Sequence, residues 1–115
     1  STPQKLFDTV DMLVVPSQAP ESFGLVAAEA MSARVPVIVS DAGALPEVVG
    51  EDYPYIYPAQ DPSALVEKIR HLTQAFYQES DNLNDIISAA FWRWQELYSP
   101  DSGRERVRHL LEKYL

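Results

Sequence analysis

The sequence contains no cysteine, and acidic residues outnumber basic residues by 17 to 9. Without cysteine, the chain can form no disulfide, no thiolate zinc site and no cysteine nucleophile. The net charge of −8 argues against nucleic-acid binding, which needs a basic face, and against electrostatic docking on anionic lipid. The longest apolar runs, at 12–15 and 35–39, are far shorter than the ~20 residues that cross a bilayer.

What the sequence does contain is typical of a soluble globular domain. Hydrophobic residues make up 46% of its 115 residues and charged residues 23%. The chain begins Ser-Thr-Pro without a methionine, so we expect a single truncated domain, 1–115, cut from a longer protein. A cytoplasmic location is expected, and a membrane-peripheral position through the missing part stays open.

Helices and strands alternate over the first 60 residues. The runs 12–15 and 36–40 lack polar alternation, which is typical of strands buried on both faces. The alanine-rich segment 24–33 between them predicts a helix, so the two strands should be adjacent and parallel. Three further elements are expected: the end of a helix at 3–9, a helical turn at 45–49 and a short strand at 55–57.

From residue 61 onward the pattern predicts helices only. Asp61-Pro62 and Ser99-Pro100 each combine an N-cap residue with proline at the first helical position. Apolar residues recur at helical spacing in three stripes: Leu65, Ile69, Leu72, Phe76; Leu83, Ile86, Ile87, Ala90, Phe91, Trp94, Leu97; and Val107, Leu110, Leu111, Tyr114. The following residues are predicted to be buried: Leu83, Ile87, Phe91, Trp94 and Leu110. Those predicted to be exposed are Glu79, Asp85 and Glu105. The aromatic cluster 91–94 is interpreted as core and rim packing.

The fold class is therefore α/β, with a partial Rossmann-like parallel sheet of about three strands followed by C-terminal helices. Parallel strands need cover on both faces, and an open sheet edge attracts another strand. We expect this fragment either to self-associate or to be completed by a missing N-terminal domain.

The loop 16–24 follows the first predicted strand and opens directly into a helix. Open α/β sheets bind ligands at this edge, and a helix N-terminus suits a phosphate or pyrophosphate. Gly24 allows close approach of the backbone.

Glu21 precedes the helix, and Glu29 lies about five residues inside it, ~7 Å along the axis. Two carboxylates in these places can bracket a ligand made of a sugar, a pyrophosphate and a second sugar. Alternatively, Glu21 only favours the helix dipole and Glu29 is a solvated helix residue.

Three segments together, 11–17, 20–31 and 36–47, resemble the retaining glycosyltransferases of family four, which have the GT-B fold. The pair Glu21 and Glu29, with seven residues between them, is similar to the E-x7-E motif of that family. The segment 58–65, Pro-Ala-Gln-Asp-Pro-Ser-Ala-Leu, is similar to its acidic-proline helix start. The resemblance runs from about residue 5 to 72.

This resemblance implies the second half of a donor-binding domain, with the nucleotide-sugar site in 1–60 and C-terminal helices in 61–115. The donor would be a nucleotide-diphosphate sugar, with no metal and no cofactor, and the acceptor a saccharide, lipid or other small molecule. Glu21 would be catalytic and contact hydroxyls of the transferred hexose. The backbone N–H groups of Phe23, Gly24 and Leu25 would face the sugar and diphosphate, and Glu29 would hold the ribose hydroxyls. Transfer would retain the anomeric configuration.

Two residues depart from the family pattern. Arg34 stands where the family usually has glycine after this helix, and Ala44 replaces the second glycine of the usual Gly-Gly turn. Both substitutions suggest an altered local backbone. The basic residues that clamp the diphosphate in this family would lie upstream of this chain. Asp41 and Glu47 follow the second strand, and they either border the site or form a turn or a cap.

Two other function classes stay open at the level of sequence. One is a non-catalytic module that binds a nucleotide-sugar or a partner protein. The other is a sugar-phosphate or nucleotide epimerase of related two-domain fold. Such epimerases usually need histidine on strand-end loops, whereas His71 and His109 both fall within predicted helices. That placement disfavours the epimerase.

Overall fold

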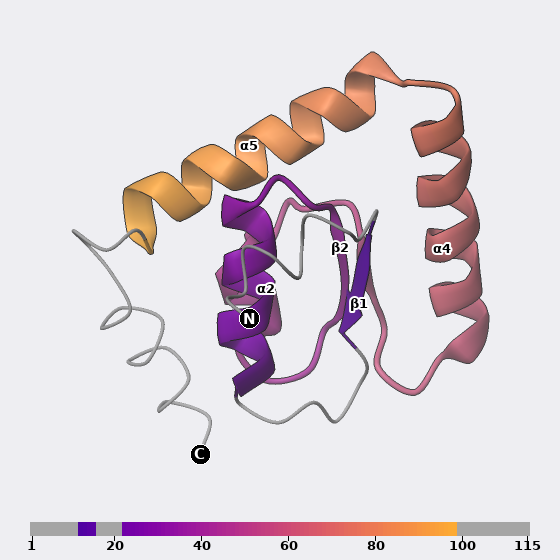
Figure 1. Ribbon diagram of the computed structural model, residues 1–115. Coiled ribbons are helices and arrows are strands. Elements are labelled where there is room, and N and C mark those ends of the chain that lie inside the picture. Colours follow the sequence, from indigo (N-terminus) through magenta and orange to yellow (C-terminus); the bar gives the residue numbers. More distant parts are fainter. Residues whose placement is uncertain (1–11, 16–21, 99–115) are drawn as a thin grey trace, which may run out of the picture.

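The computed structural model describes residues 12–15 and 22–98 (Figure 1). The expected helix end at 3–9 and the helix after Ser99-Pro100 lie outside these residues, as do Leu110 and Glu105. The elements, in chain order, are β1 (Leu13–Val15), α2 (Ser22–Ser32), β2 (Val37–Ser40), α3 (Leu45–Val49), β3 (Ile56–Tyr57), α4 (Pro62–Tyr77) and α5 (Asp81–Leu97).

The three described strands form one parallel sheet in the order β1-β2-β3. Leu13 pairs with Val37, and Val39 pairs with Ile56. The helix α2 makes the crossover between β1 and β2, which confirms that these two apolar runs are adjacent and parallel. The fold class is α/β with a Rossmann-like sheet, as the sequence predicts.

Side chains that alternate along β2 separate the interior into two clusters. Val37 and Val39 pack with α2 and α3, together with Ala27, Ala30 and Val48. Ile38 points to the opposite face, where Tyr55, Tyr57, Leu72 and Leu83 surround it. The helices α2 and α3 thus cover one face of the sheet, and α4 covers the other, so all four β2 residues are buried.

The helix α5 belongs to both clusters. Its first turn carries Leu83, which packs on the α4 face, and its later part carries Trp94, which packs on the α2 face. Figure 1 shows α5 running past the C-terminal end of α2. It therefore crosses the amino ends of the strands, opposite the edge where the sequence places the donor.

Side-chain caps fix the starts of the two long helices. Asp61 accepts a hydrogen bond from the Ala64 N–H at 3.1 Å, which confirms the predicted cap, and Pro62 follows it at the first helical position. Ser80 accepts one from the Leu83 N–H at 3.2 Å, a cap that the sequence analysis missed. Ser80 is not followed by proline, so only the residue type signals it.

Burial follows the predicted stripes only in part, because one of the four described residues predicted to be buried is fully buried. Leu83 is buried, Ile87, Phe91 and Trp94 are half-buried, and Glu79 and Asp85 are exposed. Phe76 is 40% exposed, because Ala75 and not Phe76 continues the stripe of α4 that meets the sheet. Trp92 is 62% exposed, so within the aromatic cluster it lies on the solvent side while Phe91 and Trp94 pack inward.

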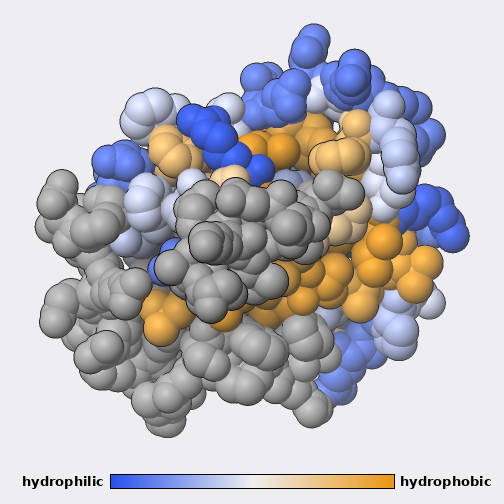
Figure 2. All heavy atoms as spheres, viewed as in Figure 1, coloured by the Kyte–Doolittle hydropathy of each residue, from blue (hydrophilic) through white to orange (hydrophobic). Residues whose placement is uncertain are grey.

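Among the described strands, β1 has β2 as its single neighbour. Leu13 and Val14 are half-buried there, and Figure 2 shows apolar side chains gathered on the face of the molecule that it presents. Self-association through this edge stays a prediction.

Candidate functional site

The first turn of α2 lies at the carboxyl edge of the sheet, where the sequence analysis places the donor. The helix begins at Ser22, two residues earlier than expected. Phe23, Gly24 and Leu25 therefore belong to its first turn, where backbone N–H groups have no partner within the helix and carry a partial positive charge. Gly24 is buried and Leu25 half-buried. Glu21 lies outside the described residues.

Glu29 lies seven residues after Ser22, which corresponds to ~10 Å along the axis and not the ~7 Å inferred from a start at Gly24. Leu25 precedes Glu29 by four residues, so the two side chains share a face of α2. The Cα–Cβ bonds of a helix tilt toward its N-terminus, and the N-terminus of α2 is the end at the carboxyl edge of the sheet. Glu29 is half-buried.

The helix α2 ends at Ser32, three residues after Glu29. The backbone carbonyl of Glu29 accepts hydrogen bonds from the Ala33 N–H at 3.1 Å and from the Ser32 hydroxyl at 2.6 Å. The Val35 N–H donates to the Ala30 carbonyl at 2.9 Å, and the Arg34 N–H donates to the Met31 carbonyl at 3.2 Å. This pair of bonds is the Schellman motif, which ends a helix with a left-handed residue.

Arg34 is that left-handed residue, with φ of 60°. The expectation of an altered backbone here is wrong, because arginine adopts the conformation that glycine would take. A non-glycine residue in this region costs roughly 1 kcal/mol. The Arg34 guanidinium carbon lies 4.1 Å from the centroid of the Phe91 ring on α5. An exposed cation–π contact is worth about 0.5–1 kcal/mol, so the contact offsets much of the strain.

The loop after β2 is tied to the loop after β3. The Asp41 carboxylate accepts a hydrogen bond from the Ala59 N–H at 2.8 Å, and the Asp41 N–H donates to the Tyr57 carbonyl at 3.0 Å. Asp41 thus acts as a turn and loop brace at the carboxyl edge, one of the two roles left open by the sequence. Ala44 is right-handed, with φ of −88°, so alanine enters α3 without backbone strain.

The helix α5 satisfies the C-terminal carbonyls of α3. Arg93 donates from Nη2 to the Glu47 carbonyl at 2.7 Å and from Nε to the Val48 carbonyl at 3.1 Å. The Tyr98 hydroxyl donates to the Glu47 carbonyl at 3.1 Å. A positive charge at a helix C-terminus also complements the helix dipole. No local sequence pattern predicts this arrangement, because the partners lie 45 to 51 residues apart.

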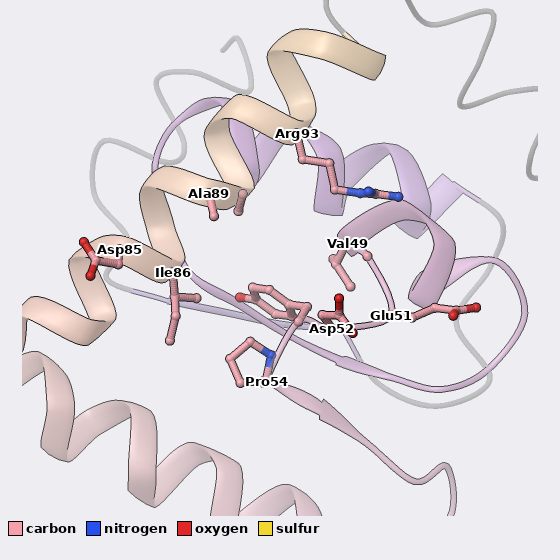
Figure 3. Close-up of a pocket in the computed structure, with 11 residues that line it drawn as sticks. Val49, Glu51, Asp52, Pro54, Asp85, Ile86, Ala89 and Arg93 are labelled. Carbon is pink, nitrogen blue, oxygen red and sulfur yellow. The ribbon is translucent and has the colours of Figure 1, made fainter.

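A cavity of about 450 Å³ lies between α5 and the connection from α3 to β3 (Figure 3). It is lined by Val49, Gly50, Glu51, Asp52, Tyr53, Pro54, Asp85, Ile86, Ala89, Ala90 and Arg93. Arg93 extends from α5 toward α3 at one end of it. Because Glu51–Pro54 precede β3, the cavity belongs to the amino edge of the sheet. It is therefore separate from the first turn of α2.

Tyr53 in the cavity wall completes the sheet. Its hydroxyl accepts from the Val37 N–H at 3.1 Å and donates to the Val37 carbonyl at 2.6 Å. Burial of the Tyr53 hydroxyl raises its pKa well above the ordinary value of 10.0. The tyrosine is thus neutral and structural at physiological pH.

His71 has a packing role and does not lie on a strand-end loop. Its Nδ1 is 3.1 Å from the Tyr55 hydroxyl, which it reaches from α4. His109 lies outside the described residues. Within residues 12–15 and 22–98, no cluster of three or more histidine, aspartate or glutamate side chains has an arrangement suited to a metal ion. No helix in the same residues is long and apolar enough to span a membrane.

Comparison with known proteins gives a consistent result. The chain is 41% identical over 64 residues to an uncharacterized glycosyltransferase of Methanocaldococcus jannaschii, a match that covers 54% of this chain and 16% of that protein. It is 29% identical over 110 residues to a sulfoquinovosyl transferase of Arabidopsis thaliana, which covers 75% of this chain and 21% of that protein. The chain thus spans about a fifth of the length of these relatives or less. No solved structure matches it.

The family comparison covers most of the chain. The family model described as Glycosyl transferases group 1 matches residues 1–89, which include β1, β2, β3 and the whole of α2. The protein therefore belongs to the group 1 glycosyl transferases.

Proposed function

We propose that this chain is the second half of the donor-binding domain of a retaining glycosyltransferase of family four, with the GT-B fold. The observation that carries the proposal is the family match over residues 1–89 combined with a helix N-terminus at the carboxyl edge of the sheet. In this proposal the nucleotide-sugar site is formed by 1–60, and the helices of 61–115 support it. The donor is a nucleotide-diphosphate sugar, and the acceptor is a saccharide, a lipid or another small molecule.

The first turn of α2 supplies the anion-binding part. The backbone N–H groups of Phe23, Gly24 and Leu25 face the diphosphate and the transferred sugar. As the bond between the anomeric carbon and the diphosphate breaks, negative charge grows on the leaving group. A helix N-terminus stabilises that charge without reorganisation at the moment of reaction.

The two glutamates have separate roles in this proposal. Glu21 contacts hydroxyls of the hexose, and its carboxylate stabilises the positive charge that develops on the sugar ring. Glu29 accepts hydrogen bonds from the ribose hydroxyls, as carboxylates commonly do with vicinal diols. The placement of Glu29 on the face of α2 that also carries Leu25 supports this role. The chemistry needs no metal and no cofactor.

The experiment that tests the proposal uses the full-length protein. It is incubated with nucleotide-sugars of different bases, with and without saccharide and lipid acceptors, and release of nucleoside diphosphate is followed. Acceptor-dependent release is the expected result, and the anomeric proton coupling of the product by NMR should match that of the donor. A product of inverted configuration would contradict retention. Nucleotide-sugar binding without any turnover would favour the non-catalytic module instead.

A further inference from the structure

Resting on the proposed function, we infer that the contact between Arg34 and Phe91 positions Glu29 for the ribose of the donor. Arg34 and Phe91 are positioning residues in this view, and neither touches the donor. The inference starts from an unusual choice of residue. A helix that ends in a Schellman motif favours glycine at the left-handed position, and this chain has arginine there with φ of 60°.

The strain at Arg34 comes with a contact that glycine could not make. The guanidinium lies over the Phe91 ring, 4.1 Å from its centroid, and joins the C-terminal end of α2 to α5. Arginine thus replaces an unstrained cap with a link between two helices. Because the strain and the contact are of similar size, stability alone gives little reason to prefer arginine over glycine.

Glu29 lies in the part of α2 that this link holds. Its carbonyl accepts bonds from the Ala33 N–H and the Ser32 hydroxyl, the two residues directly before Arg34. Arg34 is five positions after Glu29, about 7 Å along a helix. A shift of the α2 end relative to α5 is therefore passed to the backbone of Glu29 through short hydrogen bonds.

The packing of α2 makes such a link useful. The residues on its buried side are mostly small: Ala27, Ala28 and Ala30, with Met31 near the end. Alanine offers little interlocking side-chain volume, so contacts at the helix ends have a larger share in fixing the position of the helix. A small misplacement of a binding group lowers affinity sharply, because hydrogen bonds depend on geometry.

The chain offers a closely matched control. Glu79 ends α4 with the same motif, with φ of 52° and a Ser80 N–H to Ala75 carbonyl bond at 3.1 Å. Arg34→Gly and Glu79→Gly both relieve a left-handed residue. Only Arg34→Gly removes the contact with Phe91, so a difference between the two variants reports on that contact.

The experiment measures binding of UDP, ADP and GDP to the full-length protein by calorimetry, with urea unfolding of each variant beside it. We expect Arg34→Gly to weaken binding of the preferred nucleotide about fivefold while the protein stays folded, since glycine is the favoured residue there. Glu79→Gly should bind like the wild type. Phe91→Leu should weaken binding as Arg34→Gly does, and Phe91→Tyr, which keeps a ring, should restore it.

A second arm tests whether the effect passes through Glu29. The same titrations are made with the 2′,3′-dideoxy nucleotide and in a Glu29→Gln background, and the loss caused by Arg34→Gly should shrink to near onefold in both. The positioning role is overturned if Arg34→Gly weakens binding of the dideoxy nucleotide as much as binding of the natural nucleotide. It is also overturned if Arg34→Gly binds the natural nucleotide as tightly as the wild type does. Either result leaves the proposed function intact. If the wild-type protein binds none of these three nucleotides, nor CDP or dTDP, the proposed function is wrong, and the positioning role falls with it.

Discussion

Replacement of Tyr53 by phenylalanine tests how the short third strand is completed. The Val39 N–H donates to the Tyr55 carbonyl and the Asp41 N–H to the Tyr57 carbonyl, both at 3.0 Å. Two residues earlier, the β3 ladder does not extend to Val37, and on this side of β2 the Tyr53 hydroxyl takes the place of strand backbone through two hydrogen bonds. Tyr53→Phe keeps the ring and removes both bonds.

The expected cost follows from the burial of Val37, which is 1% exposed. The variant leaves one N–H and one carbonyl of Val37 without a protein partner, and each buried orphan costs about 1–3 kcal/mol. Because Tyr53 lines the cavity, water can reach part of this space and reduce the cost. We therefore expect Tyr53→Phe to lower the free energy of unfolding by about 2–4 kcal/mol.

The assay is urea unfolding followed by circular dichroism, with Tyr55→Phe as the control. Tyr55 is buried, and its hydroxyl lies 3.1 Å from Nδ1 of the exposed His71 side chain. Its loss should cost about 1 kcal/mol or less. Faster hydrogen exchange of the Val37 amide in Tyr53→Phe should accompany the destabilisation. Equal stability of the two variants would refute the reasoning.

Three further predictions concern stability. Burial raises the pKa of both Tyr53 and Tyr55 above 10.0, so these tyrosines ionise at lower pH in the unfolded chain than in the folded protein. The stability that they contribute should be intact below pH 10 and should fall as the pH rises above it. Urea unfolding midpoints measured from pH 8 to 12 should therefore fall less steeply in Tyr53→Phe than in the wild type. Arg93→Met removes two hydrogen bonds to α3 and should lower the free energy of unfolding in urea by about 2–4 kcal/mol. Arg70→Met, at an exposed position of α4, loses one ion pair and should cost less than about 0.5 kcal/mol. Equal costs would contradict the role of Arg93. Asp61→Ala removes the cap of α4 and should lower stability by about 1 kcal/mol, while Asp61→Asn should recover most of it; no recovery would argue against capping.

The fold could be predicted from the sequence wherever a local pattern is sufficient. The apolar runs of β1 and β2, the proline-marked start of α4 and the helical turn α3 all depend on residues that are neighbours in the chain. The start of α2 was misplaced because Gly24 was interpreted as part of the loop, although Ser22 and Phe23 already belong to the helix. Glycine has a low helix propensity, but propensity is a weak predictor that tertiary packing can override, and Gly24 lies within the first turn of α2.

The rest depends on contacts between distant residues. The hydrogen bonds of Arg93 to Val48 in α3 and of Tyr53 to Val37 join residues that are 45 and 16 positions apart, and no sequence pattern predicts such pairs. Arg34 illustrates a different limit. Its departure from the usual glycine was visible in the sequence, but its left-handed conformation was not, because the partner that favours it is Phe91 on α5. For the candidate site, the position of Glu29 on α2 follows from helix geometry, whereas the role of Glu21 stays a prediction.

Steady-state kinetics of Glu21→Gln and Glu29→Gln in the full-length protein, with saturating acceptor, tests the central claim most directly. Glu29 is proposed to touch the ribose, which is remote from the reacting carbon, so Glu29→Gln should raise the donor KM about 5- to 30-fold and change kcat little. Glu21 is proposed to lie where charge develops, so Glu21→Gln should lower kcat, with KM less affected. Glu67→Gln, at an exposed position of α4, serves as the control and should leave both constants unchanged. If Glu21→Gln left kcat unchanged while Glu29→Gln abolished turnover at saturating donor, the assignment of the two glutamates would be contradicted.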